Sequence, residues 1–141
     1  MFDSFDKYIS LFSDHIEAND YWHDIGSLHA SELIDKFDNK DWLALTDIII
    51  NKSDNWLARF CESVDNTTNI MVLPILTYAI ERSNKELSMK ALDAINSILS
   101  SNIDFTNYMI SIKNAIDKVK PKADKVELAV LSSLENKISN N

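Results

Sequence analysis

The stretch 40-KDWLALTDIIINKSDNWLARFCESVDN-66 contains two Trp-Leu pairs, the first beginning at Trp42 and the second at Trp56. Apolar residues follow each tryptophan at spacings of three and four, as Leu45 and Ile49 do in the first run and Phe60 does in the second. This spacing is the period of an α-helix with one buried face. Ser, Asp and Asn separate the two runs, and these residues favour the start of a helix. The stretch therefore predicts a helical hairpin in which each tryptophan anchors the first turn of a helix in a shared core.

The same helical period continues along almost the whole chain. Short polar links of about two to four residues separate the apolar runs, and links of this length make neighbouring helices pack antiparallel. We therefore expect an all-α fold of about eight antiparallel helices, stacked as helical hairpins into a short α-solenoid or a compact bundle. The expected helices cover residues 3–18, 20–36, 40–51, 53–65, 69–82, 84–100, 104–119 and 121–138.

Polar residues just before the apolar runs are candidate helix caps, because their side chains accept hydrogen bonds from the first free amides. Pro74 lies past the first turn of a helix that starts at residue 69, so it should bend that helix or delay its start. Pro121 suits the first turn of the last helix, where its missing N–H is not needed. The candidate caps are Asp3 or Ser4, Asp20, Asn39, Ser53, Asn69, Asn84 and Asp104.

Length and composition limit the class of protein. A chain of 141 residues is typical of one domain, and we assign residues 1–138 to a single α-helical domain and residues 139–141 to a frayed tail. Gly26 is the only glycine, which excludes a glycine-rich phosphate loop and argues against a sheet fold with tight hairpins. One cysteine, no signal peptide and no long apolar run predict a cytoplasmic protein without a membrane-spanning segment.

Negative charge is concentrated in the first half of the chain. Residues 1–65 hold 14 acidic and 5 basic residues, a balance of −9, whereas the remaining residues hold 8 and 9, a balance of +1. A field of one sign attracts a basic protein partner. It repels nucleic acid, whose phosphates need Lys and Arg. The alternative interpretation is a solvated face that only keeps the protein soluble.

Few residues suggest catalysis. His15, His23 and His29 lie among acidic residues, but no His-x-x-x-His or Glu-x-x-His spacing sets two metal ligands on one helix face. Cys61 falls on an apolar face without a nearby histidine, so we expect it to be a small buried hydrophobe. The sequence therefore predicts no enzymatic activity, no catalytic residue, no metal and no cofactor. A metal-dependent helical hydrolase that uses His23 and Asp24 is the enzymatic alternative.

The expected hairpins begin near residues 3, 40, 69 and 104, about 29–37 residues apart, which suits stacked helical pairs. Residues 41–99 resemble HEAT-like α-solenoid proteins, in which a later helix carries a motif like the Ala-Leu-Asp-Ala-Ile at 91–95. The Asp-Trp-Leu at 41–43 and the Asn-Trp-Leu-Ala at 55–58, in an acidic chain of this size, resemble small helical immunity proteins. These proteins belong to bacterial toxin–immunity systems such as contact-dependent growth inhibition.

The resemblance implies a cytoplasmic, non-catalytic protein that binds and neutralises one cognate toxin in a 1:1 complex. The acidic first half adds the expectation of a basic toxin, for instance a nuclease with a positive substrate groove. Tyr21 lies off the apolar stripe beside acidic residues, and we expect it to be the exposed aromatic anchor. An α-helical adaptor that binds a peptide or a cellular enzyme is the alternative. The expected partner-binding residues are Asp14, Glu17, Asp20, Tyr21, Asp24, Asp35, Asp38, Asp41 and Asp54.

Overall fold

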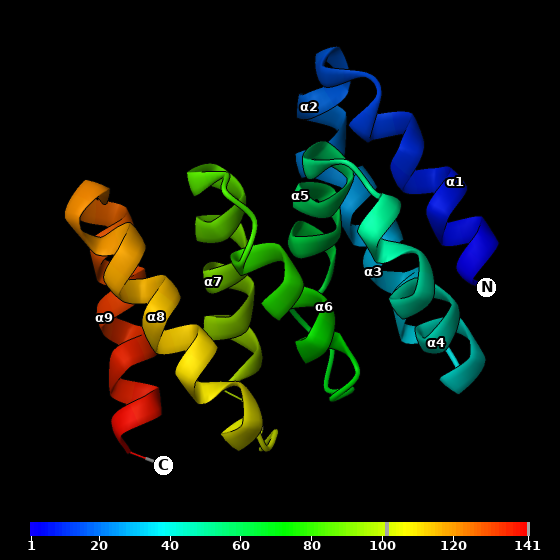
Figure 1. Ribbon diagram of the computed structural model, residues 1–141. Coiled ribbons are helices and arrows are strands. Elements are labelled where there is room, and N and C mark those ends of the chain that lie inside the picture. The colour runs from blue at the N-terminus through cyan, green and yellow to red at the C-terminus, as the bar shows by residue number, and fades with distance from the viewer. Residues whose placement is uncertain (101, 141) are drawn as a thin grey trace. The chain divides into compact units, whose positions relative to one another are not determined.

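The computed structural model of the protein describes residues 1–100 and 102–140, with the backbone alone at Ile16. These residues form helices and turns without a β-strand, which confirms the all-α prediction (Figure 1). With the continuous run from α2 to α3 taken as one helix, the described residues form eight helices, as expected. The α-helices are α1 (Phe2–Ser13), α2 (Asn19–Tyr21), α3 (Ser27–Asp35), α4 (Asn39–Ile48), α5 (Asp54–Ser63), α6 (Val72–Ile80), α7 (Lys85–Ile98), α8 (Met109–Val119) and α9 (Lys125–Ser139). The shorter segments are the 3-10 helices η1 (Ile16–Ala18), η3 (Ile49–Asn51), η4 (Thr106–Tyr108) and η5 (Lys120–Lys122), and the π-helix η2 (Trp22–Gly26).

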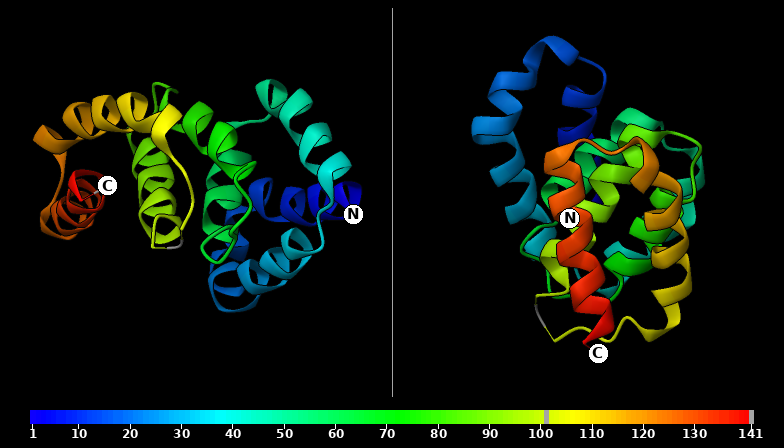
Figure 2. Two further views of the ribbon diagram at one scale, coloured as in Figure 1. Left: turned by 90° about the horizontal axis from the view of Figure 1, so that it is seen from below. Right: turned by 90° about the vertical axis from the view of Figure 1, so that its left-hand side faces the viewer.

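Two compact units make up the chain, and the boundary between them falls after Thr67. Unit 1 holds α1 to α5, where α1, α3 and α5 pack on one another and α4 lies against α1. Unit 2 holds α6 to α9, where α7 contacts α6, α8 and α9 (Figure 2). The assignment of residues 1–138 to a single domain stays a prediction.

Aromatic side chains form the centre of unit 1. The ring of Phe5 on α1 meets Trp56 at 6.0 Å and Phe37 at 5.3 Å, both edge to face, and Phe37 meets Trp42 at 5.1 Å. Trp42 and Trp56 are 1% and 2% exposed. Truncation of a buried aromatic residue costs about 3–5 kcal/mol. The prediction of two helices whose tryptophans are buried in a shared core is thus confirmed for α4 and α5, but the two helices pack mainly on α1 and α3 and not on each other as a hairpin.

Polar contacts connect α1 to α4, to α5 and to the link between them. The Asp6 carboxylate accepts hydrogen bonds from Lys52 Nζ at 2.7 Å and from the Trp56 indole N–H at 2.9 Å. The Asp41 carboxylate accepts the Phe2 amide at 2.9 Å. Charge-assisted hydrogen bonds of this kind are stronger than neutral ones. They therefore define how α1 lies across α4 and α5.

Helix α7 is the centre of unit 2. In its Ala-Leu-Asp-Ala-Ile motif, Asp93 is exposed and the four apolar residues at 91, 92, 94 and 95 are buried. Helix α9 covers this face with Leu131, Leu134 and Ile138. Lys137 on α9 donates a hydrogen bond of 2.6 Å to the carbonyl of Asn96. The motif that carries the sequence resemblance is thus the packing face of this unit.

Some of the predicted cap residues start helices in the structure, and others do not. Ser53 and Asn84 cap α5 and α7, as predicted, by accepting the amides of the third helical residues. Asp38, not Asn39, caps α4, because Asp38 and Asp41 form a reciprocal capping box. Asn69 accepts the amide of Met71 and Asp104 accepts that of Thr106, each in a turn ahead of a helix. Asp3, Ser4 and Asp20 lie inside helical segments, so they were wrong as caps.

Three helix boundaries differ from the sequence prediction: α6 and α9 begin later than expected, and α1 ends earlier. Pro74 delays the start of α6 to Val72, which places the proline in the first turn, where its missing N–H costs nothing. Helix α9 begins at Lys125 instead of 121, because Asp124 and Glu127 form a capping box after the η5 turn that holds Pro121. It continues to Ser139, and Asn141 lies outside the described residues. Helix α1 ends at Ser13 instead of 18.

In the parts of the chain at residues 1–100 and 102–140, no helix has both the length and the apolar character that a bilayer crossing requires.

Candidate functional site

The boundary between the units coincides with the boundary in charge. Residues 1–67 hold 14 acidic and 5 basic residues, a balance of −9, and residues 68–141 hold 8 and 9, a balance of +1. Together they give the net charge of −8. The excess negative charge of the chain is therefore a property of unit 1.

Within unit 1, most of the expected partner-binding residues fall into two groups at opposite ends of α3 (Figure 1). The first group lies in residues 14–24, which connect α1 to α3 and which we name the acidic turn. The second lies in residues 35–41, at the connection from α3 to α4. At 1.5 Å per residue the intervening helix separates Asp24 from Asp35 by about 16 Å. Asp54, the first residue of α5, belongs to neither group.

The acidic turn presents its carboxylates to solvent. Asp14, Glu17, Asp20 and Asp24 are all exposed. Neither lysine nor arginine occurs between Lys7 and Lys36 in the sequence, so no basic side chain of this stretch neutralises them. Glu17 lies near His15, whose Nδ1 is 3.2 Å from the Glu17 carboxylate. The segment thus carries four exposed carboxylates and contains no lysine or arginine of its own.

A buried arginine beneath the acidic turn holds it against α5. Arg59 on α5 is 8% exposed, and its guanidinium donates to the carbonyl of Phe12 at 3.4 Å and to the side chain of Asn19. Its central carbon lies 5.1 Å from the centre of the Trp22 ring, and its Nη1 lies 3.7 Å from Glu62. Burial lowers the pKa of Arg59, and the nearby Glu62 opposes this shift. An arginine starts so far above neutral pH that it stays charged.

This arginine also satisfies the backbone where α1 ends, at Ser13. The hydroxyl of Ser13 donates to the carbonyl of Ser10, and the carbonyl of Phe12 accepts Arg59. A carbonyl near the end of a helix has no intrahelical donor, so it needs a partner from elsewhere. The apolar period of the sequence runs on to Ile16, which is why periodicity alone predicted a longer helix.

The acidic turn runs into the π-helix η2, which ends at the only glycine of the chain. A Cβ atom at Gly26 would lie 2.9 Å from Trp22 Cε3 and 3.3 Å from Phe12 Cζ. Both distances are shorter than the optimal carbon–carbon separation of about 3.5–4.0 Å. Glycine therefore permits a close approach of two buried aromatic rings to the helix backbone. π-Helices are rare and occur frequently at functional sites.

Tyr21 is the exposed aromatic residue of the acidic turn, as expected. It is 52% exposed, and its ring lies parallel to that of Phe12, with 5.9 Å between the ring centres. A side chain that is stacked before it binds loses less conformational freedom on binding. Tyr21 thus has the properties of a preorganised contact residue.

The second acidic group has structural roles. Asp38 and Asp41 form the capping box of α4, and Asp41 also accepts the Phe2 amide and lies 3.3 Å from the Met1 amino group. Partial burial acts to raise the pKa of Asp41, but the hydrogen bonds from Asp38 and Phe2 and the Met1 amino group outweigh it and lower the pKa. Asp35 is exposed and Asp54 is half-buried. Asp38 and Asp41 are thus engaged within unit 1.

Each of the three histidines lies near a different glutamate. His15 lies near Glu17, and the remaining pairs are His23 with Glu62 at 3.5 Å and His29 with Glu32 at 3.8 Å. Among residues 1–100 and 102–140, no three His, Cys, Asp or Glu side chains converge as a metal site requires. Cys61 is buried, as expected. The sequence singled out His23 but not its connection through Glu62 to Arg59, because these residues lie far apart in the chain.

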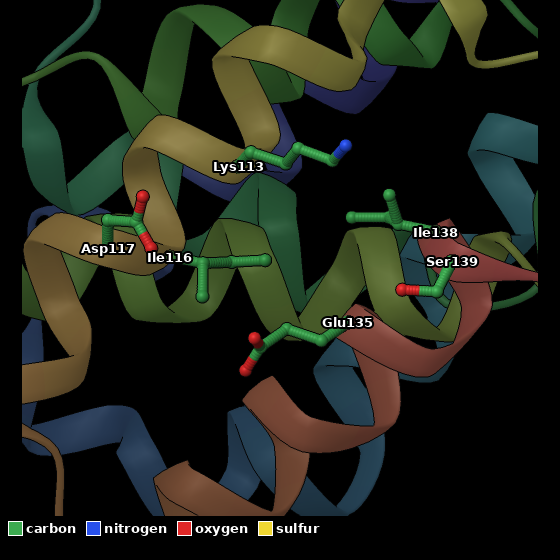
Figure 3. A pocket seen from close by; sticks show the side chains of 6 residues that line it. All are labelled: Lys113, Ile116, Asp117, Glu135, Ile138 and Ser139. Carbon is green, nitrogen blue, oxygen red and sulfur yellow. The ribbon is translucent and has the colours of Figure 1, made fainter.

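Unit 2 contains a small cavity between α8 and α9 (Figure 3). Its volume of about 190 Å³ is below the range of about 300–1,000 Å³ usual for ligand pockets. The cavity is lined by Lys113, Ile116, Asp117, Glu135, Ile138 and Ser139.

Unit 1 contains a shallow hollow of about 650 Å³ along the outer face of α1, and Tyr8, Leu11 and Asp14 are among the residues that line it.

Comparison of the chain with protein-family models, with curated proteins and with solved structures finds no match. The assignment of a function therefore depends on the acidic turn and the contacts that hold it.

Proposed function

We propose that this protein is an immunity protein, a non-catalytic inhibitor that binds one cognate basic toxin in a 1:1 complex through the acidic turn of unit 1. The observation that carries the proposal is the segregation of charge. All of the excess negative charge lies on residues 1–67, and the acidic turn exposes four carboxylates without a neighbouring lysine or arginine in the sequence.

Uncompensated carboxylates act on a partner in a defined way. Charged surfaces of one sign raise the rate of association with a partner of opposite sign by about 10- to 1,000-fold at low salt. The effect weakens as the Debye length falls to about 8 Å at physiological ionic strength. A toxin with a positive substrate groove, as a nuclease needs, is the fitting partner, and covering that groove is sufficient for inhibition. Tyr21 is the candidate anchor, since aromatic residues are enriched at the centre of interfaces.

The proposal is tested with the reading frame adjacent to the gene of this protein in its native genome. The product of that frame should arrest growth when expressed alone, and co-expression of this protein should restore growth. The purified pair should form a 1:1 complex whose association rate falls as salt is added. A harmless neighbouring product, or an association rate that does not change with salt, would contradict the proposal.

A charge-neutral variant makes the test specific to the acidic turn. The combined substitutions Asp14→Asn, Glu17→Gln, Asp20→Asn and Asp24→Asn should slow association at least about tenfold at low salt. A matched control neutralises four exposed carboxylates elsewhere and should associate at nearly the rate of the unmodified protein. Equal rates for the two variants would show that net charge, and not the acidic turn, directs binding. The control positions are Asp47, Glu86, Asp93 and Asp117.

A further inference from the structure

The continuous helical run from α2 to α3 has two apolar sides. On its outer side Tyr21, Ile25 and Leu28 follow one another at spacings of four and three, and they are 52%, 51% and 62% exposed. We name these three residues the outer stripe. The inner side faces the core of unit 1 and consists of Trp22, Gly26, Ala30 and Ile34, all buried.

Tyr21 stacks on Phe12 at the edge of the core, whereas the core of unit 1 does not use Ile25 and Leu28. The inner residues recur at intervals of four and already supply a complete buried face, so folding of the unit does not account for Ile25 and Leu28. Single exposed apolar residues are ordinary on protein surfaces, but contiguous ones mark interaction sites. From Tyr21 to Leu28, at 1.5 Å per residue, the outer stripe extends about 10 Å along the helix axis. This is the length of an anchor set at positions i, i+4 and i+7.

Carboxylates lie along one flank of the outer stripe and at its end. Asp20 and Asp24 adjoin Tyr21 and Ile25 in the sequence, and Glu32 follows Leu28 one helical turn later. All three carboxylates are exposed. An apolar line bordered by negative charge is complementary to an apolar line bordered by positive charge.

We propose that the outer stripe docks a basic amphipathic helix of the partner protein, with Ile25 and Leu28 in the apolar seam and the carboxylates paired to lysines or arginines at its edges. This inference rests on the proposed function, because it assigns the class of surface that the toxin presents to the acidic turn. A second copy of this chain is disfavoured as the occupant, since a two-fold contact sets the carboxylates of one copy against those of the other. An anionic lipid surface is disfavoured for the same reason.

The inference is tested with a synthetic helical peptide of about 18 residues, long enough to form a helix on binding. The peptide carries leucines at helical spacing with lysines and arginines on both flanks, and a peptide of the same composition in scrambled order is the reference. We expect the amphipathic peptide to bind the intact protein and to shift the backbone amide resonances of residues 20–32. The scrambled peptide should bind at least about tenfold more weakly, because it has the charge without the apolar seam.

Matched variants distinguish binding at the outer stripe from nonspecific binding to other exposed apolar residues. Ile25→Ser with Leu28→Ser should weaken peptide binding at least about tenfold. Leu43→Ser with Ile50→Ser alters two residues of unit 1 that are 55% and 69% exposed, and it should leave the dissociation constant unchanged. Equal effects of the two pairs, or amide shifts outside residues 20–32, would overturn the inference. Sedimentation that shows a dimer of the unmodified protein, lost in Ile25→Ser with Leu28→Ser, would also overturn it.

The two proposals fail in different ways. If the neighbouring gene product is harmless but the peptide binds the outer stripe, the immunity function fails and the docking inference stands. If this protein restores growth equally well with Ile25→Ser and Leu28→Ser, the immunity function stands and the docking inference fails.

Discussion

Replacing the only glycine with alanine sets two physical effects in opposition. Gly26 lies inside a continuous helical run, where alanine is favoured over glycine by about 0.5–1 kcal/mol. Helix propensity alone therefore predicts that Gly26→Ala stabilises unit 1. The packing around Gly26 predicts the opposite sign.

The magnitude of the packing effect follows from the positions of two buried rings. The new Cβ would lie 2.9 Å from Trp22 Cε3 and 3.3 Å from Phe12 Cζ, and these side chains are 0% and 7% exposed. Neither ring is the mobile end of a flexible side chain, so relief requires a movement of the helix. Overpacking of a core costs about 1–3 kcal/mol. After subtraction of the gain in propensity, we expect Gly26→Ala to reduce the free energy of unfolding by about 1–2 kcal/mol.

Tryptophan fluorescence is the appropriate assay, because Trp22, Trp42 and Trp56 all lie in unit 1. Urea titration followed by fluorescence therefore reports the unfolding of this unit specifically. Circular dichroism follows both units, and a difference between the two midpoints would reveal separate unfolding of unit 2. The free energy of unfolding is obtained by linear extrapolation to zero urea.

The reasoning is refuted if Gly26→Ala raises the free energy of unfolding by the value expected from propensity. A second background isolates the cause. With Trp22→Leu the closest ring is removed, and Gly26→Ala should then become neutral or stabilising, as measured by the remaining two tryptophans. An unchanged penalty in that background would assign the cost to the π-helix backbone instead of the rings.

Two further substitutions test the contacts of unit 1. Arg59→Leu should lower the free energy of unfolding by about 2–4 kcal/mol in urea titrations, because it leaves the buried carbonyl of Phe12 without the Arg59 donor and Glu62 without its cation. Asp41→Asn should destabilise the protein at neutral pH, and Asp47→Asn, an exposed position on the same helix, should not. The pKa of Asp41 is lowered on folding, so its contribution is present above the ordinary aspartate pKa and is lost as the pH falls through the folded value. The difference between Asp41→Asn and the unmodified protein should thus disappear in acid, and a difference that persists there would contradict the ionic origin.

Local signals predicted those parts of the fold that depend on local chemistry. The two Trp-Leu pairs predicted α4 and α5 as two helices with buried tryptophans, because each tryptophan begins a helical period that only a buried face explains. They did not predict that each helix packs on α1 instead of on the other. Ser53 and Asn84 were recognisable caps because a cap needs only the next three residues. The capping box that starts α9 was equally readable as Asp124 and Glu127 at the correct spacing, but the expected effect of the nearby proline outweighed it.

Tertiary contacts account for what the sequence did not indicate. Asp41 belongs to an acidic run in the sequence, and only the folded chain brings the Phe2 amide to its carboxylate. Arg59 occurs in an apolar run, and its partners Phe12 and Asn19 lie about 40 residues away or more, beyond any local pattern. The π-helix leaves no signature in spacing, because residues at intervals of four suit both an α-helix and a π-helix. The acidic segments 14–24 and 35–41 could be found in the sequence, but their separation by the length of α3 could not.

Departures from ordinary packing gather around the acidic turn. Arg59 is a charge taken out of water, η2 is a rare helix type and Gly26 accommodates two rings at short distance. The buried indole N–H of Trp22 finds no acceptor among the described residues. A buried donor without an acceptor costs about 1–3 kcal/mol, and a glycine inside a helix costs about 0.5–1 kcal/mol relative to alanine. A regular helix would direct Leu28 differently relative to Tyr21, because a π-turn rotates every residue that follows it. Local rules are expected to fail where a surface is constrained by something other than stability. The concentration of these features beneath the acidic turn is therefore the physical reason to look there for the partner.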